Sequence, residues 1–178
     1  MSHGQTVRRG GAYNRLAEPA WAEPLDVSHS QRHGGRWNVP GTFGVLYLNR
    51  GVRTARLQVH HRLLGQPYGV EDLDAAEQHD LVDVDVPDIE WLDCVTDDGL
   101  RAVGLPVGYP RDRDGAEVAW SACRLVAQAA HDDGQPGLAC RSAATGATTD
   151  DEELAVFDTH ARQVRQSGHT PFADWYWA

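Results

Sequence analysis

The 178-residue sequence contains no lysine, one methionine and three cysteines. It has no run of about 20 uninterrupted apolar residues, the length of a membrane-spanning helix. The opening stretch MSHGQTVRRGG lacks the apolar centre of a signal peptide. These absences predict a soluble, cytoplasmic protein with no membrane segment. Cys94, Cys123 and Cys140 fit neither a zinc pattern nor a disulfide framework, so we expect buried free thiols and no bound metal.

All 16 basic residues are arginines, and with 26 acidic residues they give a formal net charge of −10. This balance argues against direct binding to nucleic acid, because affinity for a phosphate backbone comes mainly from clustered basic side chains. A GC-rich genome is one explanation for the missing lysine. Whatever its origin, an anionic ligand of this protein must be held by guanidinium groups, which suit phosphate and carboxylate.

Apolar patterning predicts a mixture of strands and helices without a regular βαβ repeat, so we expect an α+β fold. The predicted strands cover residues 41–49, 81–86, 137–142 and 153–157, and the predicted helices cover 54–64, 97–103 and 117–130. Neither a repeat nor a linker is visible, which predicts a single domain over residues 1–178. The aromatic tail, residues 171–178, is expected to dock on the body or to belong to a partner interface. The acidic run 150–153 is interpreted as a solvated turn with acids near the start of a strand, and not as a metal site.

The segment GGRWNVPGT, residues 34–42, is the most informative part of the chain. Its two glycines allow a ligand to approach the main chain closely. Arg36 follows them and Trp37 lies beside it, a combination that suits a phosphorylated ligand carrying a ring. The alternative is an ordinary glycine turn with Arg36 pointing to solvent.

The order of segments distinguishes these alternatives, because it resembles the RES domain family. In the first part of the chain, GGRWN and PG at residues 34–38 and 40–41 are followed by VLY on a predicted strand and then by an alanine-containing helix. Late in the chain, GL, SA and VF occur at residues 137–138, 142–143 and 156–157. The resemblance covers about residues 13 to 158. The family takes its name from an arginine, a glutamate and a serine.

The resemblance implies a fold similar to the ADP-ribosyltransferase toxins, in which small mixed sheets flank a cleft for NAD. It implies a toxin of a bacterial toxin–antitoxin pair, which degrades its substrate NAD by breaking the nicotinamide–ribose bond. Water or inorganic phosphate is the acceptor, and no metal takes part. The implied partner is an Xre-type DNA-binding antitoxin that covers the cleft, so the toxin itself need not touch nucleic acid.

The same resemblance assigns the site residues. Contacts with NAD are expected from Arg15, Gly35, Arg36, Trp37, Tyr47 and Ser142. Arg36 matches the family arginine and is expected to bind a phosphate of NAD. Tyr47 is expected near the nicotinamide ribose, and Ser142 is expected to form a polar wall for ribose or phosphate. The catalytic set is Arg36, Tyr47, Gln58 and Ser142.

Gln58 stands where the family has its glutamate, in the sequence ARLQV. A carboxylate there stabilises the positive charge that develops on ribose as the bond breaks, and a neutral amide cannot supply that charge. Three explanations stay open: an introduced substitution, a natural variant in which another acid such as Glu71 or Glu90 has taken over, or a protein that binds NAD or ADP-ribose without turnover. Transfer of ADP-ribose to a protein is a further alternative.

Overall fold

A computed structural model of the chain describes residues 4–178. Residues 1–3, the start of the opening stretch MSHGQTVRRGG, lie outside the described part. The described strands are β1 (Thr6–Ala17), β2 (Val45–Asn49), β3 (Asp80–Cys94), β4 (Gly137–Arg141), β5 (Glu152–Phe157) and β6 (Arg165–Thr170). The described α-helices are α1 (Ser28–His33), α2 (Val52–Leu63), α3 (Asp97–Ala102), α4 (Trp120–Asp132), α5 (Asp158–Ala161) and α6 (Phe172–Trp175). The predicted mixture of helices and strands is confirmed.

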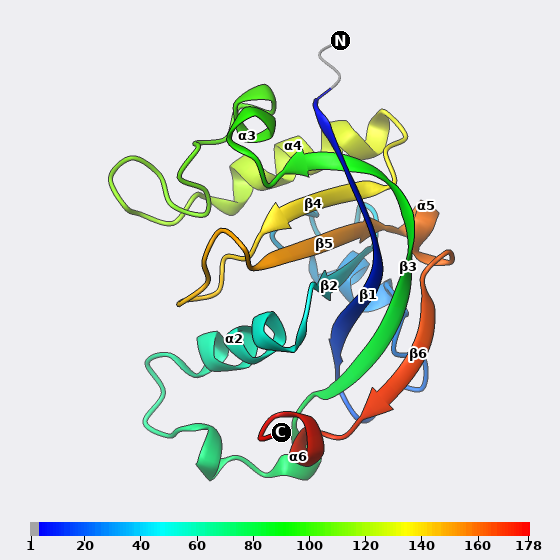
Figure 1. Cartoon of the computed structure of the whole chain (residues 1–178), viewed down its shortest axis with the longest axis vertical. Helices are drawn as coiled ribbons and strands as arrows, with labels where there is room; N and C mark the ends of the chain where they lie inside the picture. Colours follow the sequence, from blue (N-terminus) through cyan, green and yellow to red (C-terminus); the bar gives the residue numbers. More distant parts are fainter. Residues whose placement is uncertain (1–3) are drawn as a thin grey trace.

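The strands form one sheet that closes on itself. Their order is β1-β2-β5-β4-β3-β6, and β1 pairs additionally with β3. Five strands therefore form a barrel-like ring, and β6 extends it alongside β3 (Figure 1). Only β3 and β4 run parallel among the described pairings. β1 and β2 pair at one position, where Asn14 is opposite Asn49. The helix α2 lies beside β2 (Figure 1).

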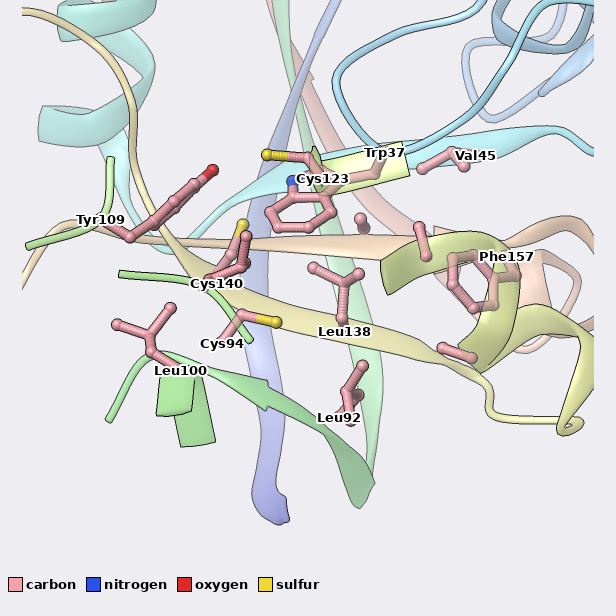
Figure 2. Packing of buried hydrophobic residues seen from close by; sticks show 14 of the residues in the cluster. Trp37, Val45, Leu92, Cys94, Leu100, Tyr109, Cys123, Leu138, Cys140 and Phe157 are labelled. Atoms are coloured by element: carbon pink, nitrogen blue, oxygen red, sulfur yellow. The ribbon is translucent and has the colours of Figure 1, made fainter. Parts of the chain in front are cut away.

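Alternation along the strands separates two layers of core, because successive side chains point to opposite faces of a sheet. Leu46, Leu48 and Val156 face the inside of the ring, where Trp91 is also buried. The intervening residues face outward and pack under α4. Figure 2 shows this outer core, whose members include Trp37, Cys94, Cys123, Leu138, Cys140 and Phe157. All three cysteines are buried and free, which confirms that prediction.

The strand predicted to stop before Pro87 continues to Cys94, so that boundary was wrong. Pro87 lies where the register between β1 and β3 shifts, since Arg9 is opposite Ile89 and Gly11 is opposite Val86. A bulge of this kind disrupts the ladder locally, so the missing N–H of proline is tolerated there. The opposing strand β1 was not predicted, because its sequence TVRRGGAYNRLA has no clean alternation. The strand β6, RQSGHT, was missed for the same reason.

The aromatic tail docks on the body, which confirms the first of the two alternatives left by the sequence. Phe172 and Trp175 in α6 are 2% and 3% exposed, and the Trp175 indole N–H donates to the carbonyl of His79 at 3.1 Å. Arg56 of α2 donates to the carbonyls of Trp175 and Tyr176. The tail therefore fixes the helix that carries Gln58. Among residues 4–178, no helix is both long and apolar enough to cross a membrane.

Candidate functional site

A cleft of about 290 Å³ lies between β2, β5, α2 and the first residue of α4. The side chains that line it include Arg36, Tyr47, Gln58, Trp120 and Glu153. A second cavity of about 560 Å³ adjoins it, because Ala143 and Ala144 line both. Ser142 lines this second cavity. Together the two spaces fall within the range of about 300–1,000 Å³ usual for small-molecule sites.

The glycine loop is held against β2 by close packing that only glycine allows. Gly34 has a φ of +72°, in the left-handed region that favours glycine. A Cβ on Gly35 would collide with the hydroxyl of Tyr47. The side chain of Asn38 is fully buried and donates to the carbonyls of Ser30 and Phe43 at 2.8 and 3.0 Å. These contacts fix the direction in which Arg36 leaves the loop.

The hydroxyl of Tyr47 is occupied by the loop. It donates to Oδ1 of Asn38 at 2.9 Å and accepts from the backbone N–H of Trp37 at 3.0 Å. Burial raises the pKa of Tyr47 well above its ordinary value, so the phenol stays protonated. Within the cleft Tyr47 therefore offers mainly its ring, while its hydroxyl connects β2 to the loop.

Arg36 lies beside an exposed aromatic ring at the mouth of the cleft. Its guanidinium carbon is 5.6 Å from the centroid of Trp120, and Arg124 lies 5.3 Å from the same centroid. Arg36 forms an ion pair with Glu117, and the hydrogen bond from Arg36 lowers the pKa of that carboxyl. Since Trp120 is 46% exposed, its ring is available for a ligand, and the two arginines give this end of the cleft a positive charge.

Gln58, Ser142 and Glu153 meet on the floor of the cleft. The side-chain amide of Gln58 donates to a carboxylate oxygen of Glu153 and lies 3.4 Å from the hydroxyl oxygen of Ser142. Ser142 is 2% exposed. Burial raises the pKa of Glu153, although hydrogen bonds from Ser142 and Gln58 oppose that shift. A carboxyl group therefore lies directly beside the position where the sequence has glutamine.

The structure brings four of the expected residues together and leaves Arg15 apart. Arg36, Tyr47 and Gln58 line one cleft, and Ser142 contacts Gln58 beneath it. Arg15 is buried on the other side of β1, where it donates to the carbonyl of Asp26 at 3.2 Å and lies 5.4 Å from the ring of Trp21. Alternation along β1 explains the difference, because its neighbour Leu16 lines the cleft instead.

The other two expected contacts belong to the loop. Gly35 packs against the Tyr47 hydroxyl, and its carbonyl accepts from Arg124 at 2.9 Å. Trp37 borders the cleft but is 1% exposed and packs in the outer core, 5.8 Å from the ring of Tyr109 (Figure 2). Both residues thus shape the cleft, and neither presents a free polar side chain to a ligand.

The acidic run at residues 150–153 is only partly the solvated turn near a strand start that its sequence predicted: Asp150 is exposed in a turn and β5 begins at Glu152, but the acids that follow Asp150 are not solvated. Asp151 and Glu152 are 5% and 7% exposed, and Glu153 begins the part of β5 that borders the cleft. Glu71 and Glu90, proposed from the sequence as substitute acids, do not line the cleft. Glu90 lies on β3 opposite Arg8 and is exposed. The direction of the Glu153 side chain depends on how β5 pairs with its neighbouring strands. A run of four acidic residues in the sequence does not reveal that pairing.

Sequence reasoning also missed Trp120, which lies within the helix predicted over residues 117–130 and was not expected at the site. Its position as the first residue of α4, after the irregular segment 104–119, was the available signal, because a helix terminus leaves a large ring partly uncovered. Among residues 4–178 no group of three or more histidine, cysteine, aspartate or glutamate side chains is arranged to hold a metal ion.

Comparisons with known proteins place this cleft in a family. The family model described as the RES domain matches residues 9–175. Proteins named NAD(+) phosphorylase MbcT from Mycobacterium bovis and Mycobacterium tuberculosis are each 31% identical over 112 residues, which are 62% of this chain. The match spans 56% of the length of these relatives.

The fold also has a solved counterpart. A crystal structure of the Mycobacterium tuberculosis MbcT–MbcA toxin–antitoxin complex contains a chain that superimposes with a TM-score of 0.77 at 20% identity, covering 97% of this chain and 92% of the other. At this identity the likeness establishes the fold alone. The family model, in contrast, covers nearly the whole sequence and includes the glycine loop, the strand of Tyr47 and Ser142. The chain therefore belongs to the RES domain family.

Proposed function

We propose that this protein degrades NAD by breaking the bond between nicotinamide and ribose. The observation that carries the proposal is the convergence of Arg36, Tyr47, Gln58 and Ser142, from four separate segments, around one cleft and its floor. The name NAD(+) phosphorylase of the relatives supports the same reaction and favours inorganic phosphate over water as acceptor. NAD is the substrate, and the proposed reaction requires no metal.

The proposed step needs no nucleophile from the protein. An oxygen of phosphate or water forms a bond with the anomeric carbon of ribose while the carbon–nitrogen bond breaks. The bonding electron pair passes to the ring nitrogen of nicotinamide and cancels its positive charge. Phosphate gives ADP-ribose 1-phosphate, and water gives ADP-ribose and a proton released to solvent.

The cleft offers a role to each of its polar and aromatic groups. Arg36 is suited to a phosphate of NAD, because a guanidinium forms paired, charge-assisted hydrogen bonds with phosphate oxygens. The rings of Tyr47 and Trp120 are suited to stacking with nicotinamide or adenine. Ser142 is suited to a ribose hydroxyl. In this proposal Glu117 is displaced from Arg36 when the phosphate binds.

We further propose that residues 1–178 form a single domain with an ADP-ribosyltransferase-like fold, and that the protein acts in the cytoplasm as the toxin of a toxin–antitoxin pair. The fold of the MbcT–MbcA complex supports this assignment. The net charge of −10 fits a partner that supplies the contacts with DNA, so the proposed partner is an Xre-type DNA-binding antitoxin.

Incubation of the purified chain with NAD tests the enzymatic proposal. We expect release of nicotinamide, measured by liquid chromatography, and a faster reaction when phosphate is added. Mass spectrometry of the second product identifies the acceptor. Arg36→Gln should weaken NAD binding at least tenfold, because it removes the charge offered to phosphate. Tight NAD binding without nicotinamide release would overturn the proposal and favour the silent NAD-binding alternative raised by Gln58.

A further inference from the structure

The cleavage of NAD places a demand on the cleft that Gln58 cannot meet. As nicotinamide leaves, positive charge develops on the ribose, and a nearby carboxylate stabilises it. Gln58 lies on α2 with its side chain at the floor of the cleft, yet an amide carries no charge. A carboxylate must therefore come from another element if the chain is active.

Two consecutive glutamates on β5 face opposite sides of the sheet, and only one borders the cleft. Glu152 accepts hydrogen bonds from Arg9 at 2.7 and 2.9 Å and from Arg50 at 2.8 Å, so its charge is neutralised. Glu153 lies opposite Asn49 of β2 and Cys140 of β4, and its side chain lines the cleft. Alternation along β5 therefore separates a structural carboxyl from one that a ligand can reach.

Glu153 accepts hydrogen bonds but forms no ion pair among residues 4–178. Within the described residues, no arginine or histidine lies within ion-pairing distance, 4.0 Å, of its carboxylate. Several ionisable or polar groups face it or share its cleft: Arg36, Tyr47, Gln58, His61, Arg62, Tyr109, Cys140 and Ser142. Burial dominates among these influences and raises the pKa of Glu153. A partly buried, unpaired carboxyl in a cleft is typical of functional sites.

We propose that Glu153 supplies the negative charge that stabilises the ribose in the transition state, and that Gln58 positions it. The amide of Gln58 donates to the Glu153 carboxylate, and Ser142 lies within reach of both. During the step Glu153 forms no covalent bond and transfers no proton. The electron pair of the broken bond goes to nicotinamide, and the acceptor oxygen bonds to the anomeric carbon. This inference rests on the proposed NAD-degrading function.

Exchange of the two side chains gives a direct test. Nicotinamide release from NAD is measured for the full chain, Glu153→Gln, and the double variant Gln58→Glu with Glu153→Gln. The double variant keeps one carboxyl and one amide at the same hydrogen bond but moves the charge to α2. Glu77→Gln is the matched control, since Glu77 is an exposed acid outside the cleft.

Glu153→Gln should lower the rate of release about 10²–10³-fold, the usual effect of losing one electrostatic group in an active site. The affinity of Glu153→Gln for NAD, measured by calorimetry, should stay within about threefold of the wild-type affinity. The double variant should release nicotinamide at least tenfold faster than Glu153→Gln. Glu77→Gln should equal the wild type.

Thermal unfolding distinguishes this role from a structural one. The raised pKa means that folding favours the neutral carboxyl, so stability is lost as the pH rises through that pKa. At pH 7 Glu153→Gln should therefore unfold at the same temperature as the wild type or a higher one. Nicotinamide release by Glu153→Gln within threefold of an active wild type would overturn this inference alone. No release by the wild type would overturn both this inference and the proposed function.

Discussion

Replacement of Asn38 by alanine should destabilise the protein by about 3–5 kcal/mol. The side chain is 0% exposed and makes three hydrogen bonds, two as donor to carbonyls at 2.8 and 3.0 Å and one as acceptor from Tyr47 at 2.9 Å. Each bond contributes about 1 kcal/mol net, and each polar group left buried without a partner costs about 1–3 kcal/mol. In Asn38→Ala the carbonyl of Ser30 still accepts a hydrogen bond from the N–H of Gly34. The expected loss of stability is therefore smaller than the sum of the largest penalties for three unpaired groups.

Urea unfolding measures this cost, and the slope m shows whether the transition still exposes the same surface. Tyr47→Phe removes one partner and should cost about 1–2 kcal/mol. The double variant should cost less than the sum of the two single variants by about 1 kcal/mol, because no tyrosine hydroxyl is then left unpaired. Gln163→Ala, an exposed amide, is the control and should stay within about 0.5 kcal/mol. A loss below about 0.5 kcal/mol for Asn38→Ala would refute the assignment of Asn38 as the central support of the loop.

Three further changes test other parts of the molecule. Glu152→Gln should cost about 2–4 kcal/mol at pH 7 in urea unfolding, since it breaks a largely buried pair with Arg9 and a second pair with the half-exposed Arg50. Burial raises the pKa of Glu152, but the hydrogen bonds and charges of Arg9 and Arg50 together outweigh burial and lower that pKa. The wild type should therefore lose its advantage as the pH falls through the lowered pKa. Trp120→Ala should weaken NAD binding in calorimetry about 5-fold or more through lost stacking. Its melting temperature should change little, because Trp120 is 46% exposed. An unchanged affinity for NAD would contradict the proposed stacking of a ligand ring on Trp120. Trp175→Ala should cost about 3–5 kcal/mol in thermal unfolding, and an unchanged melting temperature would show that the docked tail contributes nothing.

The glycine loop and the order of segments were sufficient to predict much of the cleft. Arg36, Tyr47 and Gln58 occur within 23 consecutive residues of one loop–strand–helix unit, so local sequence fixes their relative positions. Ser142 was predicted from the resemblance to the RES domain family, which places a serine after the strand at residues 137–142. Arg15, expected from the resemblance, lies apart from the cleft, and β1 has too little alternation to show from the sequence which of two neighbours faces it.

Long-range pairing accounts for what the sequence did not reveal. The barrel-like closure depends on β1 pairing with β3 about 70 residues later in the chain, through an irregular register around Gly11. Glu153 faces the cleft only because β5 pairs with β2 on one side and β4 on the other. In the sequence it is one of four consecutive acids. The side chain proposed to carry the charge could therefore not be recognised until β4 and the distant strand β2 were placed beside it.

In the proposed mechanism, the proximity of Gln58 and Glu153 makes glutamine compatible with catalysis in this cleft. When two carboxyl groups lie at hydrogen-bonding distance, the repulsion between like charges strongly raises the pKa of one of them, which favours a shared proton and a neutral donor. Gln58 already provides such a donor through its amide. The single variant Gln58→Glu should therefore add a group that is largely protonated beside Glu153, and its rate of nicotinamide release should change far less than that of Glu153→Gln. A rise of 100-fold or more in Gln58→Glu would instead show that the cleft lacks an effective carboxylate as it stands.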